Sequence, residues 1–302
     1  LDVELRSWND GDNPYELALD GAGAALNNVA LGQSLTADHV LRFQDLIPQA
    51  NYQLATYALA ELFTRKDEAE IAELRKAGQA IDAVHAQVPK LLQPGRTEAE
   101  VAQELEELIL QEHTVIDFVI VGSGPNGANP HHSFSDRVLA EGEPVVVDIG
   151  GTLPSGYHSD CTRTYVVGAA NDFAKEIYDV VLRAQKAGVA ASVPGAKLAD
   201  VDAACRDIIS AAGYGAYFVH STGHGVGLDV HEAPFAAQTG KGELAAGMTL
   251  TIEPMINLGG LGYEVWDDDW TVQTNDRKWT AQFEHTLVVT EDGCDVLTAL
   301  DS

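Results

Sequence analysis

The chain repeats one pattern at an interval of 100 residues, and this repeat constrains its fold more than any other feature. Pro94-Gly95 precedes a stretch with apolar residues at helical spacing, and Pro194-Gly195 precedes a second stretch in the same register. After each helix we expect a strand and then a glycine-rich segment that bears histidines, GSGPNGANPHH in the first round and HSTGHGVGLDVHE in the second. Two rounds are too few for a solenoid array. We therefore predict a duplicated α/β unit whose two halves face each other.

Carboxylates also occupy matching places in the two rounds. Asp148 in AEGEPVVVDIG and Glu253 in AAGMTLTIEPM each stand six residues after a glycine. Each round then ends on a second acidic position in a β-rich run, Asp160 in HSDCTRTY and Glu284 in AQFEHTLVV. Asp148 and Asp160 can face the same side of a hairpin if the loop between them sets the register. Each half is thus predicted to contribute two carboxylates to the interface between the halves.

Buried carboxylates need partners, because an isolated buried charge is costly. Basic residues are scarce: Arg163 follows Asp160, but none lies within ten positions of Glu253. A proton-sharing pair explains two carboxylates more readily than four. Divalent cations offset the repulsion among all four, and four acids with one imidazole suit two ions about 3.5 to 4 Å apart. The ligand types indicate Mn(II), Co(II), Fe(II) or Zn(II) without choosing among them.

Histidines gather in the two glycine-rich segments. His224 lies between glycines, where the backbone can approach a bound group closely, and His231 follows seven residues later. His131 follows Pro130 in the first round, and we expect these three imidazoles in the cleft. His285 stands beside an acidic strand position and is expected to face the other way by alternation. Five other histidines are left unassigned, with ordinary surface or core roles favoured: His39, His85, His113, His158 and His220.

Charge and hydropathy exclude several classes of partner. The formal net charge of -28 argues against nucleic acid or an anionic membrane, because both would repel the chain. No apolar run approaches the roughly 18 to 20 residues of a membrane span, and the N-terminus lacks the layout of a signal peptide. We therefore expect a soluble, cytoplasmic protein. Three scattered cysteines without a CxxC indicate neither a disulfide framework nor a thiolate zinc site.

The character of the chain changes near residue 65. The first 64 residues mix loop signals such as NDGDNP with short apolar runs, which favours a small α/β domain. A long amphipathic helix then begins, with Pro89 near its end. We predict one domain over residues 1–64 and a second over 65–302. Because the chain starts at Leu1, in a segment that resembles the interior of a domain, we expect an N-terminal part to be missing.

Six sequence blocks resemble those of a known enzyme family: PHH, VVVDIGG, HSDCTRTY, HSTGHGVGLDVHE, TIEPMI and AQFEHTLVVTEDG. They are similar to the blocks of the pita-bread metallopeptidases, which include methionine aminopeptidase, prolidase and Xaa-Pro aminopeptidase. The resemblance runs from about residue 65 to the end. It implies an α+β pita-bread catalytic domain with a pseudo-twofold axis. Residues 1–64 resemble the end of the creatinase-like N-terminal domain of the Xaa-Pro enzymes.

The resemblance implies a set of metal ligands. Asp148 would bind one ion, Asp160 and Glu284 would bridge the pair, and His224 and Glu253 would hold the second ion. Two divalent ions are implied, with manganese the ion we expect and cobalt, iron or zinc the alternatives.

The resemblance also implies a mechanism. A bridging hydroxide would attack the scissile carbonyl, and Glu253 would help to shuttle its proton. His131 and His231 would position the substrate and stabilise the tetrahedral intermediate. Relatives commonly form dimers through the N-terminal domain, so a homodimer is expected.

Two features bear on the substrate. Prolidases and Xaa-Pro aminopeptidases usually carry arginine two residues before the final glutamate, where this chain has Gln282, and the segment before it resembles methionine aminopeptidase. The N-terminal segment and NPHHSFSDRV instead resemble the Xaa-Pro enzymes. We expect hydrolysis of the N-terminal Xaa-Pro bond in dipeptides or short peptides. The alternatives are a methionine aminopeptidase, a metal-free hydrolase of the creatinase type and a non-catalytic peptide-binding module.

Overall fold

A computed structural model describes residues 5–20, 26–170, 172–257, 263–265, 272–274 and 280–299. The chain folds as two compact units, Leu1–Phe63 and Thr64–Ser302. In the described part of the chain, no helix combines the length and the apolar character that crossing a membrane requires.

The first unit is a small α/β arrangement built on two strands. Strands β1 and β2 pair in parallel, and α2 lies between them in the sequence. Asn13 caps the first helix by accepting a hydrogen bond from the Tyr15 amide at 3.1 Å. The elements are α1 (Pro14–Leu19), β1 (Asn28–Leu31), α2 (Ala37–Leu46), β2 (Asn51–Leu54), α3 (Ala55–Ala58) and α4 (Ala60–Thr64).

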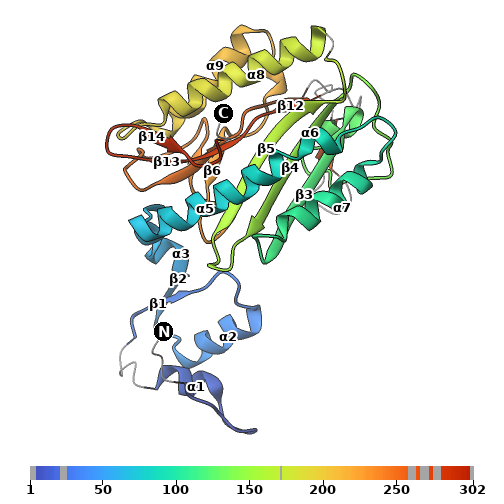
Figure 1. Ribbon diagram of the computed structural model, residues 1–302. Helices are drawn as coiled ribbons and strands as arrows, with labels where there is room; N and C mark the ends of the chain where they lie inside the picture. Colours follow the sequence, from blue (N-terminus) through green and yellow to red (C-terminus); the bar gives the residue numbers. More distant parts are fainter. Residues whose placement is uncertain are drawn as a thin grey trace. The chain divides into compact units, whose positions relative to one another are not determined.

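The second unit begins with three helices and an antiparallel sheet in the order β3-β4-β5. Asp67 and Thr97 start α5 and α7, and each forms a capping box with a glutamate three residues later. Helices α5 and α7 pack on this sheet, as Figure 1 shows. The elements are α5 (Glu68–His85), α6 (Val88–Leu91), α7 (Glu98–Ile109), β3 (Val115–Ser123), η1 (Gly124–Ala128), β4 (Pro144–Thr152) and β5 (His158–Val166).

The second half of this unit again combines two helices with antiparallel strands. Helix α8 packs on β8, β9 and β12, and α9 packs on β7. Strand β13 lies between β8 and β14, and three antiparallel pairs are β6 with β7, β9 with β12 and β10 with β11. The elements are α8 (Asp172–Ala191), α9 (Leu198–Ala211), η2 (Gly215–Tyr217), β6 (Gly223–Gly225), β7 (Glu232–Ala236), β8 (Thr249–Ile252), β9 (Met255–Asn257), β10 (Tyr263–Val265), β11 (Val272–Thr274), β12 (Thr280–Gln282), β13 (His285–Val289) and β14 (Cys294–Val296).

The predicted repeat of the helices is confirmed. Helix α7 begins at Glu98 and α9 at Leu198, and Val101 and Val201 are both fully buried. The expectation of a strand after each helix is correct for β3 but wrong for the second round, where η2 follows α9. Arg206, on α9, donates to two carbonyl oxygens of the segment after this helix, those of Phe218 and His220, at 2.7 and 2.8 Å. A side chain therefore satisfies backbone acceptors that a strand would pair in a ladder.

The two halves of this unit meet along β5 and the segment 282–286. The Glu284 amide donates to the Thr162 carbonyl oxygen at 3.0 Å, and the Gln282 amide donates to Thr164 Oγ1 at 2.9 Å. These bonds bring the acidic residue of the second half to the hairpin of the first half.

Candidate metal centre

The hairpin of β4 and β5 presents two acids on one face. Asp148 lies opposite Thr162, and Gly150 lies opposite Asp160. Because side chains alternate along a strand, Asp148 and Gly150 share a face, and Asp160 shares it with them. The register therefore confirms that both carboxylates point to the same side of the sheet.

The two acids of the second half follow from the register of β8 and β13. His285 pairs with Ile252, so Glu284 and Glu253 are the next residues beyond the paired ends. The Glu253 amide donates to the Thr222 carbonyl oxygen at 2.8 Å, which fixes the backbone at this position.

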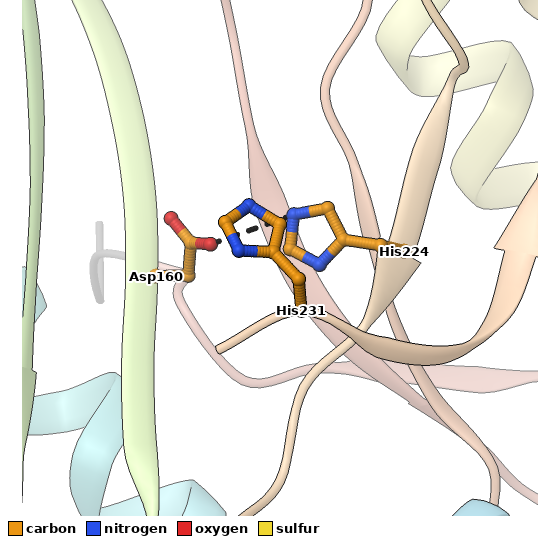
Figure 2. Close-up of side chains that lie close together, drawn as sticks. All are labelled: Asp160, His224 and His231. Carbon is orange, nitrogen blue, oxygen red and sulfur yellow. Dashed lines mark ion pairs between the residues drawn. The ribbon is translucent and has the colours of Figure 1, made fainter. Parts of the chain in front are cut away.

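Close backbone contact places His224 beside these acids. A Cβ added to Gly223 would lie 1.8 Å from the carbonyl oxygen of Thr251, so only glycine fits there. His224 Nε2 lies 3.4 Å from Glu253 Oε1 and 3.6 Å from Asp160 Oδ2. Figure 2 shows Asp160 reaching toward the imidazoles from β5 while His224 extends from β6 on the opposite side.

Three overlapping groups of possible metal ligands result. Within each group the ligand atoms lie within 4.8 Å of one another. The groups are Asp148, Asp160 and Glu284; His224, Glu253 and Glu284; and Asp160, His224 and His231. The structure thus brings together all five residues that the resemblance marked as ligands, and Asp160, His224 and Glu284 each occur in two groups.

Burial and mutual repulsion dominate the electrostatics of the site. Burial raises the pKa of Asp148, Asp160 and Glu253 well above the ordinary range, and the neighbouring carboxylates raise these pKa values further. Burial also raises the pKa of Glu284. Asp148 Oδ1 and Glu284 Oε1 are buried with no hydrogen-bond partner among the described residues. Buried oxygen atoms of this kind are costly unless a cation contacts them.

The protonation of His224 also indicates that the site needs a cation. Its Nδ1 lies 3.0 Å from the Gly225 carbonyl oxygen, which can only accept, so Nδ1 carries the proton. Burial lowers the pKa of His224 to about 4, so the ring is neutral at pH 7. The lone pair of Nε2 then faces two carboxylate oxygens, an arrangement that a divalent cation between them would stabilise. A backbone carbonyl that fixes the tautomer is common among metal-binding histidines.

Arginine does not neutralise these carboxylates. The guanidinium of Arg163 donates to the Glu284 backbone carbonyl at 2.9 Å and to Asp82 Oδ1 at 3.1 Å. Among the residues that the structure describes, no lysine or arginine forms an ion pair with Asp148, Asp160, Glu253 or Glu284. The donor set of carboxylates and one neutral imidazole fits divalent cations that prefer oxygen and nitrogen ligands.

The other predicted histidines occupy different places. The His231 ring lies 4.2 Å from the His224 ring, centroid to centroid, and belongs to one ligand group. His131 is near enough to His231 to lower its pKa, although burial is the larger cause. Of the described residues, neither His131 nor His285 joins a ligand group. His285 Nδ1 instead lies 3.1 Å from Thr298 Oγ1.

Sequence reasoning missed residues that hold the site in place. Thr162 Oγ1 donates to Glu284 Oε2 at 2.9 Å, and alternation with Asp160 along β5 could have revealed it. Lys66 forms a buried ion pair with Glu232, the neighbour of His231. No local pattern could have joined positions so distant in the sequence.

Comparison with known proteins gives one consistent result. Residues 72–291 match the profile of metallopeptidase family M24. The chain is 46% identical over 294 residues to the probable dipeptidase PepE of Mycobacterium tuberculosis, covering 97% of this chain and 74% of that protein. It is 40% identical over 237 residues to the Xaa-Pro dipeptidase of Pyrococcus furiosus, covering 77% of this chain and 62% of that protein.

The structure is similar to that of the dipeptidase PepE from Mycobacterium ulcerans, with a TM-score of 0.87 and 44% identity. The match covers 98% of this chain and 75% of the other. The expected α+β pita-bread fold is confirmed.

Proposed function

The chain belongs to metallopeptidase family M24, and we propose that it hydrolyses the N-terminal Xaa-Pro bond of dipeptides or short peptides with two divalent ions. The observation that carries the proposal is the convergence of two buried carboxylates, Asp160 and Glu284, and two partly buried ones on a neutral imidazole, with no lysine or arginine among the described residues to balance them. The likeness to a protein named Xaa-Pro dipeptidase supports the substrate class.

The residues of the site divide between two ions. Asp148, Asp160 and Glu284 would hold one, and His224 and Glu253 would hold the other together with the shared carboxylates. When bound, the ions would polarise the scissile carbonyl and make water nucleophilic at neutral pH. We propose manganese as the ion, with cobalt, iron and zinc as the alternatives.

Glu253 is the group proposed to move a proton. Its Oε2 accepts a hydrogen bond from Gln282 Nε2 at 3.1 Å, which fixes the carboxylate while adding no charge. Glu253 would take a proton from the attacking water on a carboxylate oxygen and then deliver it to the leaving nitrogen.

His131 and His231 are proposed to bind the peptide. His231 packs against His224, and its ring is partly open to solvent, so it can donate to a substrate oxygen beside the ligands. His131 would contact the same substrate from the loop that follows η1. Donors placed where negative charge develops stabilise the tetrahedral intermediate.

Metal reconstitution tests the function. Protein stripped by a chelator is reloaded with Mn(II), Co(II), Fe(II) or Zn(II) and assayed on Ala-Pro, Ala-Pro-Ala and Met-Ala-Ser. We expect hydrolysis of the proline peptides only after reloading. Cleavage of Met-Ala-Ser alone would identify a methionine aminopeptidase, and binding of peptide without hydrolysis by any loaded form would identify a binding module.

Two further assignments have their own tests. Alanine at Asp160 or Glu284 is expected to reduce metal content and hydrolysis, and unchanged values would rule out the shared-ligand assignment. A homodimer, which the family resemblance implies, is tested by sedimentation of the full chain.

A further inference from the structure

A buried carboxylate outside the metal site accepts hydrogen bonds from several residues of one loop. Glu98, at the first position of α7, is fully buried. Its Oε1 accepts hydrogen bonds from the amide and hydroxyl of Ser123 and from Asn126 Nδ2, the last at 3.0 Å. Its Oε2 lies 2.7 Å from Ser135 Oγ and 2.8 Å from His132 Nε2. The partners all belong to the segment 123–135, which also contains His131.

The carboxylate is charged, and its charge fixes the orientation of the partners. Burial by itself would raise the pKa of Glu98, but hydrogen bonds from His132, Ser123 and Ser135 outweigh burial and bring the pKa to about 2. An ionised carboxylate only accepts. His132 Nε2 therefore carries a proton directed at Glu98, and this bond fixes the ring of the residue that follows His131 in the sequence.

Helix capping does not explain Glu98. Thr97 already caps α7, because its Oγ1 accepts from the Glu100 amide at 3.1 Å and the Glu100 side chain accepts from the Thr97 amide at 2.9 Å. The Glu98 side chain thus binds the loop and does not cap the helix. The loop is also held from the second half, where Asn257 Nδ2 donates to the Ala128 carbonyl at 2.6 Å.

We propose that Glu98 is a positioning residue for His131, holding the segment 123–135 so that this imidazole meets the peptide. The proposal rests on the proposed function, in which His131 contacts substrate. Glu98 acts only through the loop. It binds His132, and His131 is the residue just before His132 in the sequence. Charge-assisted hydrogen bonds of this kind are short and directional, which suits the role.

A double-mutant cycle separates positioning from general stability. Glu98→Gln keeps the size of the side chain and presents an NH₂ group to a cluster of donors. In the native background we expect kcat/KM on Ala-Pro to fall about 10- to 100-fold, the loss typical of a displaced catalytic group. In a His131→Ala background the same substitution is expected to change kcat/KM less than about 2-fold. Metal content should stay unchanged in both.

Asp202→Asn is the matched control. Asp202 is a buried carboxylate of α9 that binds Arg206 and Thr222 in the other half of the unit. Its effect on kcat/KM is expected to be the same with and without His131. An equal loss from Glu98→Gln in both backgrounds, or a loss that follows metal content, would overturn the proposal.

A spectroscopic readout makes the proposal independent of peptidase activity. In zinc-loaded protein, the ring signals of His131, identified by their disappearance in His131→Ala, should shift in Glu98→Gln while those of the remote His85 stay in place. If the native protein hydrolyses no peptide, the proposed function fails, whereas unshifted His131 signals would refute positioning. Should Glu98→Gln not fold, Ser135→Ala, which removes one donor, is expected to give the same pattern with smaller changes.

Discussion

Glu284→Gln should stabilise the metal-free protein while it abolishes metal binding. Glu284 Oε2 accepts a hydrogen bond from Thr162, whereas Oε1 is buried with no partner among the described residues. Glu284 also belongs to a ligand group with Asp148 and Asp160. An amide can keep the first bond through its oxygen. Its NH₂ group would then replace the unpartnered oxygen and donate to a neighbouring carboxylate.

The magnitude follows from the separation of the charges. Ligand atoms in the group lie within 4.8 Å, and at that distance two carboxylates repel by about 3.5 kcal/mol at an effective dielectric constant of about 20. Partial protonation relieves some of this repulsion. We therefore expect Glu284→Gln to stabilise the metal-free protein by about 1 to 3 kcal/mol at pH 8.

The pH dependence has a definite sign. The pKa values of Asp148, Asp160 and Glu253 are raised in the folded state, so the folded protein binds more protons than the unfolded chain. Their contribution to stability is fully present below the unfolded pKa of about 4 and is lost as the pH rises toward the folded pKa values. Metal-free protein should therefore be less stable at pH 8 than at pH 5. The gain from Glu284→Gln should be smaller at pH 5.

Urea unfolding with chelator and with Mn(II), at pH 5 and pH 8, measures these differences. The control is Glu143→Gln, because Glu143 is buried but pairs with Arg137 at 2.6 Å. This control should destabilise the protein with and without metal. If Glu284→Gln also destabilises the metal-free protein at pH 8, the repulsion account is refuted.

Three further substitutions test other contacts. Gly223→Ala places a Cβ against a backbone carbonyl of β8 and should cost several kcal/mol with loss of metal, whereas Gly293→Ala meets nothing within 4 Å and should be nearly neutral by thermal melting. Lys66→Ala leaves buried Glu232 unpaired and should cost about 3 to 5 kcal/mol in urea unfolding, while replacing both partners by apolar residues should cost far less. His231→Ala should lower kcat/KM on Ala-Pro about 100-fold with metal content retained, and an unchanged rate would remove it from the site.

Local patterns predicted the features that depend on spacing. The 100-residue repeat located α7 and α9, since both helices begin after a Pro-Gly pair and bury matching valines. Strand alternation gave the common face of Asp148 and Asp160, because the register of one hairpin decides it.

Contacts between remote segments could not be predicted in this way. Glu98 resembles any acidic residue in the first turn of a helix, where the helix dipole favours it. Its burial depends on a loop that begins 25 residues later. The pair of Lys66 with Glu232 spans 166 residues. The segment that ends at His220 does not form the expected strand, because Arg206 binds its backbone carbonyl oxygens. Each of these interactions exists only after the chain has folded.

Metal stoichiometry measured together with activity tests the central claim most directly. Chelated protein is titrated with Mn(II), bound metal is measured by elemental analysis, and hydrolysis of Ala-Pro is followed in the same samples. We predict two ions per chain at saturation, with hydrolysis absent from the stripped protein and restored as the ions bind. Full activity in the stripped protein would contradict the account. So would a titration that ends with no metal bound to the protein.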